Sequence, residues 1–260
     1  MCSREKRGRH RHPRASLDRI NALASHGVST VHEALGRTGY LGPGLRPVWP
    51  GCRTGGNAVT VLCWPGDNLM IHVAVEQCRE GDILVVTTTS PSTDGMFGEL
   101  FATALSHRGV RGVVINAGVR DVAELRAMGF PAWSAAVSAQ GTVKATPGAV
   151  NVPITIGGQL IRPGDTIIAD DDGVLVTPRE DLERGIAAAA ARAAKEAAAR
   201  EAFAKGELGL DRYALRERLP GLGISYVTAG DHETGRHEHR HPEHGYPEHG
   251  RQEHGEHGPA

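Results

Sequence analysis

The sequence is poor in aromatic residues, in cysteine motifs and in long apolar runs. Aromatic residues make up 4% of the 260 residues, so the core must consist mostly of aliphatic side chains. The cysteines are Cys2, Cys52, Cys63 and Cys78, and they form no C-x-x-C pair, which favours a reduced, cytoplasmic setting. No apolar run is long enough to span a membrane, and the charged N-terminus lacks the apolar segment of a signal peptide.

The charge balance excludes further classes of protein. A formal net charge of −1 argues against a protein whose whole surface binds nucleic acid or a membrane. No G-x-G-x-x-G loop follows an expected strand, which disfavours an adenosyl cofactor and with it methyl transfer. The length suits one large or two small domains with a sizeable core.

Composition divides the chain into four segments. Residues 1–15 are basic and aperiodic, and we expect a disordered leader rather than a nucleic-acid arm. Residues 16–178 alternate expected helices and strands, which indicates an α/β domain. Residues 179–228 are expected to form a helical extension. Residues 229–260 form a low-complexity, His-rich tail, expected to be disordered and to bind transition metals only weakly.

The stretch from Gly98 to Trp133 carries the candidate chemistry. A helix is expected after Gly98, and its free N–H groups could hold a carboxylate or phosphate. A buried strand is expected over Val110 to Ile115, followed by a Gly-containing turn over Asn116 to Arg120. Arg120 and Asp121 therefore stand where a strand ends, the position at which α/β folds place ligand contacts. An aspartate there could hold a divalent metal while the arginine neutralises a substrate oxygen. Asp121 is equally explained as a helix N-cap with Arg120 in solvent, and the spacing leaves both interpretations open. Earlier in the chain, Asp67 is expected to cap an apolar helix over residues 69–78.

Several segments resemble one known family. They are GELFAT, RGVRGVVINAGVRDVAELRAMGFPAWS, GTVKATPGAVNVPI and RPGDTIIADDDGVLVTP. They are similar to the 4-hydroxy-4-methyl-2-oxoglutarate / 4-carboxy-4-hydroxy-2-oxoadipate aldolases, whose superfamily includes the regulator of ribonuclease E activity. The resemblance runs from about Val28 to Tyr226, and the spacing between GELF and GVRD is a specific signal. It implies an α/β fold with a layered β/β/α, swivelling-domain-like core and a helical C-terminal extension.

The resemblance also implies an activity. It is divalent-metal-dependent cleavage of one or both of these acids to pyruvate plus pyruvate or oxaloacetate, with oxaloacetate decarboxylation as a side reaction. Arg120 and Asp121 would be catalytic, with Asp121 binding Mg²⁺ or Mn²⁺ directly and Arg120 stabilising the oxyanion. The implied substrate-binding residues are Gly98, Glu99, Leu100, Phe101 and Arg120.

Further acids are implied around the metal and between subunits. Glu99, where the family often has Asp, and Glu196 would each hold a water on the metal. Glu196 would come from a neighbouring subunit of a homotrimer or hexamer, with Glu201 as the alternative. An i,i+4 pair explains either helix carboxylate equally well. Thr30 and Glu33 have the T-x-x-E form of a capping box, although the family's acid at Glu33 approaches a neighbour's site.

Two rival functions remain from the sequence. A non-catalytic, ribonuclease-binding regulator of the same superfamily is disfavoured by the long helical C-terminus and its GELGLD segment. A Schiff-base aldolase would use Lys144, which lies in the GTVK motif. The resemblance implies a metal-dependent enzyme, so an electrostatic or structural role for Lys144 is expected instead.

Overall fold

The structure of the protein is a computed structural model that describes residues 12–227. Contacts divide the chain into two compact units, one reaching to Ala204 and the other starting at Lys205. The predicted His-rich tail lies outside the described residues, and so does the basic leader as far as residue 11. None of the helices within the described part is both long and apolar enough to cross a membrane.

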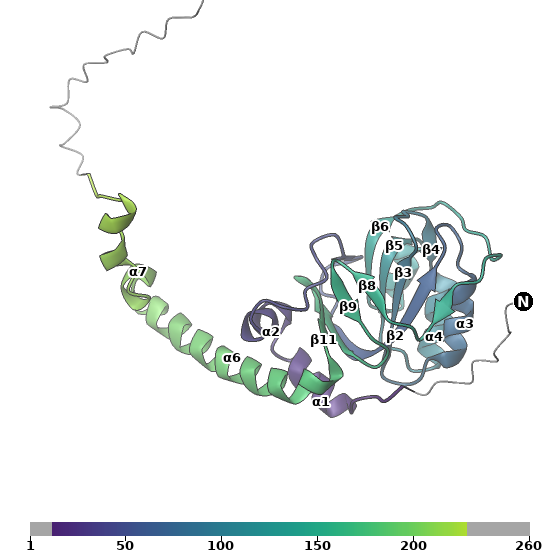
Figure 1. Cartoon of the computed structure of the whole chain (residues 1–260), viewed down its shortest axis with the longest axis horizontal. Coiled ribbons are helices and arrows are strands. Elements are labelled where there is room, and N and C mark those ends of the chain that lie inside the picture. Colours follow the sequence, from purple (N-terminus) through teal and green to yellow (C-terminus); the bar gives the residue numbers. More distant parts are fainter. Residues whose placement is uncertain (1–11, 228–260) are drawn as a thin grey trace, which may run out of the picture. The chain divides into compact units, whose positions relative to one another are not determined.

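The first unit is built on one large mixed sheet (Figure 1). Its strand order is β1-β6-β5-β3-β2-β10-β11, with β4 added to β5 and β7 added to β2. The central strands β2, β3, β5 and β6 are parallel, whereas β1, β10 and β11 pair antiparallel. The strands are β1 (Arg46–Pro47), β2 (Thr54–Cys63), β3 (Asp82–Thr88), β4 (Gly95–Phe97), β5 (Val113–Val119), β6 (Ala132–Val137), β7 (Ala149–Val150), β10 (Thr166–Asp170) and β11 (Gly173–Thr177).

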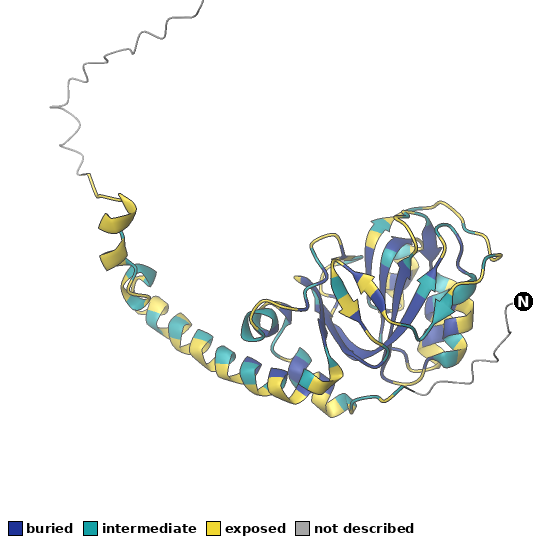
Figure 2. Ribbon diagram, in the orientation of Figure 1, coloured by how far each residue is buried: buried dark blue, intermediate teal, exposed yellow. Residues whose placement is uncertain are grey.

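Different elements cover the two faces of this sheet. Helices α3 (Leu69–Gln77), α4 (Glu99–His107) and α5 (Val122–Ala127) pack on one face around an aliphatic core. The hairpin of β8 (Ile154–Ile156) and β9 (Gln159–Ile161) covers the other face. The central strands are therefore buried on both faces, as Figure 2 shows in dark blue, which explains their nearly continuous Val, Ile and Leu runs. The predicted α/β class with a layered core is confirmed.

The sheet curls until its two ends approach each other. Trp133 of β6 donates its indole N–H to the carbonyl of Asp170 over 2.9 Å. Arg46 of β1 donates to the carbonyl of Asp171 over 3.2 Å. No strand pairing joins β1 to β11 in the described chain, so the sheet is nearly closed but not a complete barrel.

A third apolar cluster joins the first helices to the long C-terminal one. Helices α1 (Leu17–Ala24), α2 (Val28–Ala34) and α6 (Leu182–Ala204) pack against β10 and β11. A short 3-10 turn, η1 (Arg179–Asp181), precedes α6. The predicted helical extension thus begins within the first unit. In the second unit it continues as α7 (Gly209–Arg212), η2 (Arg216–Arg218) and η3 (Pro220–Leu222).

The start of α2 differs from the prediction. The helix begins at Val28, so Thr30 lies inside it and cannot form the expected capping box with Glu33. The side chain of Asp170 accepts the Val28 N–H over 2.8 Å instead. The cap is supplied by a residue far away in the sequence, which a local motif cannot reveal.

The described end of the expected leader is held on the core. Arg14 donates two hydrogen bonds, of 2.7 and 2.8 Å, to the buried carboxylate of Asp82. The backbone of Ala15 exchanges hydrogen bonds with the side chain of Asn57. Arg14 and Ala15, which the sequence assigned to the leader, therefore pack on the α/β domain.

Candidate functional site

A pocket of about 210 Å³ lies between the starts of α3 and α4 and the end of β5. The predicted residues Gly98, Leu100, Phe101, Arg120 and Asp121 all line it. The structure therefore brings together two motifs that the sequence separates by about twenty residues. The other lining residues are Asn68, His72, Val75, Gly95, Met96, Ala104 and Lys144.

Asp121 occupies a backbone conformation that is uncommon for a side-chain-bearing residue. Its φ of 56° and ψ of 41° are left-handed, at the N-cap position of α5. Its side chain does not cap α5, and Oδ2 instead accepts the Glu99 N–H at the start of α4, over 3.1 Å. The interpretation of Asp121 as a cap of its own helix is therefore insufficient. Left-handed backbone at such a residue costs about 1–3 kcal/mol, and such strain gathers at functional sites.

Arg120 and Asp121 form an ion pair that contributes little to the stability of the fold. Nε of Arg120 lies 3.6 Å from Asp121 Oδ2, and the two side chains are 46% and 39% exposed. Ion pairs this open to solvent contribute about 0–1 kcal/mol, since water screens them. Both groups therefore remain available to a ligand in the pocket.

Gly98 permits the close approach of the two motifs. A Cβ at this position would collide with Asp121 Oδ2 and would lie 3.0 Å from Cγ of Arg120. Two of the four amides expected to bind a carboxylate already have acceptors in the protein. Glu99 donates to Asp121, and Phe101 donates to the Gly98 carbonyl over 3.2 Å. The amides of Gly98 and Leu100 have no such acceptor among residues 12–227 and are left for a ligand.

The carboxylates of Glu99 and Glu196 do not line the pocket of their own chain. Glu99 Oε1 accepts the hydroxyl of Thr103, one helical turn further along α4, over 2.8 Å. Glu196, on α6, accepts the hydroxyl of Thr30 over 3.0 Å and Nε of Arg192 over 2.8 Å.

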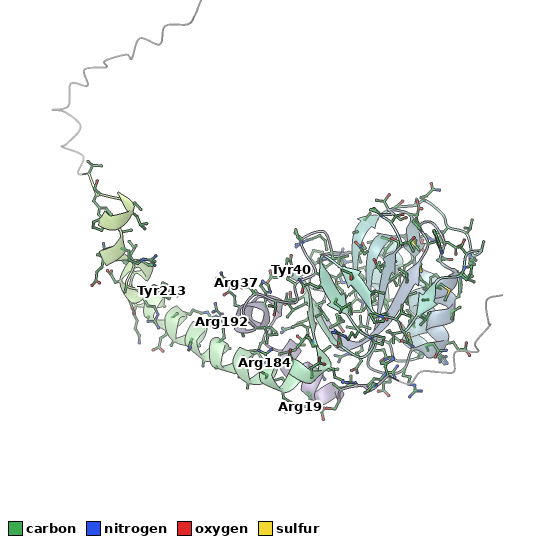
Figure 3. All side chains as sticks on the ribbon, in the orientation of Figure 1. Arg19, Arg37, Tyr40, Arg184, Arg192 and Tyr213 are labelled. Atoms are coloured by element: carbon green, nitrogen blue, oxygen red, sulfur yellow. The ribbon has the colours of Figure 1, made fainter. Side chains whose placement is uncertain are left out.

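The acids of α2 and α6 share one network of charges. Arg192 pairs with Glu196 on its own helix and lies 3.7 Å from Glu33 Oε2 on α2. Arg37 binds the other oxygen of Glu33 over 3.0 Å. Figure 3 labels the two arginines, which reach this network from α6 and from the turn after α2. The hydrogen bond from Arg37, followed by the charges of Arg37 and Arg192, outweighs desolvation and lowers the pKa of the Glu33 carboxyl.

Two pocket residues, Asn68 and His72, were not expected from the sequence. Asn68 donates to the Met96 carbonyl over 3.1 Å, while its buried Oδ1 has no hydrogen-bond partner among the described residues. His72 packs against Phe101, with ring centroids 4.5 Å apart. Desolvation, followed by the charge of Lys144, lowers the pKa of His72. Asn68, the N-cap of α3, and His72 are four residues apart and so lie on one face at the start of a mostly apolar helix, a signal that could have revealed them.

The donors at the pocket fit one kind of metal ion. Both protein contacts of Asp121 fall on Oδ2, so Oδ1 has no hydrogen bond from residues 12–227. Within that range, no three His, Cys, Asp or Glu residues gather as a closed metal cage. A single carboxylate suits Mg²⁺, which keeps several waters, and not Zn²⁺, which requires a set of nitrogen or sulfur ligands.

Fold and site together define a β/β/α protein with an arginine–aspartate pair at a pocket. The family described as RraA-like, Aldolase/RraA, matches residues 28–176, and the chain belongs to that family.

Sequence relatives agree with this assignment. A protein of Halalkalibacterium halodurans named "Putative 4-hydroxy-4-methyl-2-oxoglutarate aldolase" is 28% identical over 199 residues, covering 76% of this chain and 95% of that protein. A protein of the same name from Burkholderia multivorans is 35% identical over 158 residues, covering 60% and 96%.

Solved structures show the same fold. An uncharacterized protein from Pseudomonas syringae pv. tomato aligns with a TM-score of 0.65 at 24% identity, covering 76% of this chain and 97% of that one. Streptomyces coelicolor RraAS2, described as an unusual member of the RNase ES inhibitor RraA family, also aligns with a TM-score of 0.65. It is 26% identical and covers 73% of this chain and 98% of its own.

Proposed function

We propose that the protein is a divalent-metal-dependent aldolase. Its substrates would be 4-hydroxy-4-methyl-2-oxoglutarate, 4-carboxy-4-hydroxy-2-oxoadipate or both, and one product would be pyruvate. The observation that carries the proposal is the meeting of Arg120, Asp121 and the start of α4 at one pocket. The two relatives named as aldolases support it.

The proposed reaction develops negative charge on one oxygen atom of the substrate. The C4 hydroxyl loses its proton and becomes a carbonyl as the C3–C4 bond breaks, and the electron pair moves onto the pyruvate fragment as an enolate. Proton uptake at C3 then gives pyruvate. Most of the barrier is the negative charge that develops on the 2-oxo oxygen, so electrostatic stabilisation there should dominate catalysis.

The pocket residues would bind the substrate and stabilise this charge in separate ways. Asp121 would hold Mg²⁺ or Mn²⁺, which supplies Lewis acidity toward the 2-oxo acid end of the substrate. The planar guanidinium of Arg120 would donate to the oxygen that gains charge. The amides of Gly98 and Leu100 would bind the carboxylate, beside the apolar side chain of Phe101.

Two further side chains fit the rest of the substrate. The unpartnered Asn68 Oδ1 is an acceptor that the C4 hydroxyl can satisfy, and a buried acceptor without a donor is costly. Lys144 places a positive charge at the pocket, where it would attract the distal carboxylate. The Lys144 side chain is exposed. This exposure does not favour a Schiff base, which requires a desolvated lysine of lowered pKa.

The same pocket accounts for a second reaction. Oxaloacetate would lose CO₂ through the same enolate, so we propose decarboxylase activity as well. We also propose a homotrimer or hexamer, in which Glu196 of the partner subunit completes the pocket. Glu99 is proposed to act through water, because its carboxylate does not line the pocket.

One finding favours a second function. The chain aligns with nearly the full length of an RNase ES inhibitor family member, which supports a ribonuclease-binding regulator as the alternative. The deciding experiment measures pyruvate released from each acid at saturating Mg²⁺. An aldolase is expected to release pyruvate from at least one of the two acids. If the folded protein releases pyruvate from neither acid, the aldolase proposal is overturned and the ribonuclease-binding regulator is the remaining candidate.

A further inference from the structure

Asp67 is a buried carboxylate beside the pocket, and the proposed reaction does not use it. The residue is 3% exposed and lies between β2 and α3. Its Oδ1 accepts the Leu69 N–H over 2.9 Å, which fixes the first turn of α3. The predicted helix contact is therefore present, although Asn68 occupies the N-cap position and the helix ends at Gln77.

The other oxygen of Asp67 holds a loop that is distant in sequence. Oδ2 accepts the N–H of Ala145 over 2.9 Å and that of Thr146 over 2.6 Å. Both amides immediately follow Lys144, which lines the pocket. One carboxylate thus connects the start of α3, which bears Asn68 and His72, with the loop that bears Lys144.

Backbone contacts hold the same two segments together. The Val143 N–H donates to the Gly66 carbonyl over 2.9 Å, and the Asn68 N–H donates to the Val143 carbonyl over 3.0 Å. Further along, the indole of Trp64 donates to the carbonyl of Pro147 over 3.1 Å. Asp67 accepts the two amides on the C-terminal side of Lys144, and Val143, on its N-terminal side, is hydrogen-bonded to Gly66 and Asn68. The backbone of the lysine is therefore fixed from both directions.

We propose that Asp67 is a positioning residue that holds Lys144 at the pocket that His72 also lines. The carboxylate does this by accepting the two amides that follow the lysine while it anchors the helix that carries the histidine. The effect on catalysis rests on the function proposed above, whereas the placement of Lys144 does not.

The charge of Asp67 is part of this role. Burial alone would raise the pKa of this carboxyl, but hydrogen bonds from Leu69, Ala145 and Thr146 outweigh burial and lower it. The group is therefore ionised at neutral pH, and an ionised carboxylate accepts on both oxygens. In an Asp67→Asn variant, one oxygen becomes an NH₂ group that donates only. Either the Leu69 contact or the two loop contacts must then be lost, and in either case the side chain no longer ties the start of α3, which bears His72, to the loop that bears Lys144.

His72 reports on the position of Lys144 without any assay of activity. The charge of Lys144 helps to lower the pKa of His72, after desolvation. The other charged groups that line the pocket are Arg120 and Asp121, and none of the variants below changes them. The test titrates His72 by NMR in wild-type protein, Asp67→Asn, Lys144→Gln and the double variant. Each single substitution is expected to raise the pKa of His72, and the double variant is expected to rise no further than Lys144→Gln alone.

Asp165 provides the matched control. It is also 3% exposed and accepts two backbone N–H groups, from Arg162 over 2.7 Å and from Arg179 over 3.2 Å, but it does not line the pocket. Asp165→Asn should leave the pKa of His72 unchanged. The inference is overturned if Asp67→Asn also leaves it unchanged, or if Asp165→Asn raises it equally. An additive double variant would overturn it too.

A second variant covers the case in which Asp67→Asn does not fold. Asp67→Ser keeps an acceptor for the Leu69 N–H, because a serine hydroxyl can accept a backbone N–H at the start of a helix. The shorter side chain cannot reach both loop amides. It should raise the pKa of His72 in the same way, and an unchanged value would contradict the inference. If the aldolase function holds, Asp67→Asn should also raise KM several-fold with little change in kcat, since Lys144 attracts substrate and transition state alike. If the pKa of His72 rises in Asp67→Asn but the wild-type protein has no aldolase activity, the positioning role is supported and the proposed function is rejected.

Discussion

The backbone N–H of Glu99 donates a hydrogen bond to Asp121 Oδ2 over 3.1 Å. This contact fixes Asp121, which lies just beyond β5, to the start of α4, and it uses Oδ2, so Oδ1 has no hydrogen bond from the described residues and can bind a ligand. The same hydrogen bond joins the GEL and RD segments of the sequence at one pocket. The adjoining Gly98 has no room for a side chain.

Replacing Arg120 with Lys should lower kcat by about 10²–10³-fold, the cost of losing one well-placed oxyanion donor. Lysine keeps the charge but cannot reproduce the planar set of donors. Steady-state pyruvate release is the measurement. Arg126→Lys, on the exposed last turn of α5, is the control and should remain near wild type. Equal rates in the two variants would remove Arg120 from the mechanism.

Gly98→Ala should lower turnover by about 10²-fold, because displacement of reacting groups by about 1 Å can have that effect. The added Cβ would push against Asp121 Oδ2 and the stem of Arg120. Gly44→Ala is the control, since nothing lies within 4 Å of a Cβ there. Both proteins should fold, which circular dichroism checks. Full activity in Gly98→Ala would show that the tight contact has no catalytic importance.

The stability contributed by Asp67 should depend on pH. Its pKa in the folded protein lies below the ordinary value of 3.8, so the unfolded chain binds a proton first as the pH falls. The contribution is therefore complete above pH 3.8 and is lost as the pH falls through the folded pKa. Urea unfolding of wild type and Asp67→Asn should differ most near neutral pH and converge at low pH. A difference that stays constant with pH would contradict the assignment.

Mixing two inactive variants tests the shared site. Asp121→Ala and Glu196→Ala chains should each be inactive, and mixed oligomers should regain some activity, because they contain pockets with both residues intact. Confirmed subunit exchange without any recovery would mean that Glu196 does not act in a neighbour's site. Its bonds to Thr30 and Arg192 would then be its whole role.

Local patterns in the sequence predicted the central motifs well. The helix after Gly98 and the joining of the two motifs at one pocket follow from apolar periodicity and from the spacing of the resemblance. The buried strand before Arg120 was also expected, but it extends to Val119, through residues expected to form a turn. Asn68 and His72 were missed because a mostly apolar helix is explained by the core alone. The cap of α2 could not be predicted, since its acceptor, Asp170, is 142 residues away from Val28. The same holds for Asp67, whose partners at residues 145 and 146 become neighbours only through the fold.

Metal dependence of pyruvate release in the wild type and in Asp121→Asn tests the central claim most directly. The asparagine keeps the shape of the side chain but removes the charge that would hold the cation. Wild-type protein treated with a chelator should lose activity and regain it on addition of Mg²⁺ or Mn²⁺, while Asp121→Asn should stay inactive at every metal concentration. Near-normal, chelator-resistant release of pyruvate by Asp121→Asn would contradict the account.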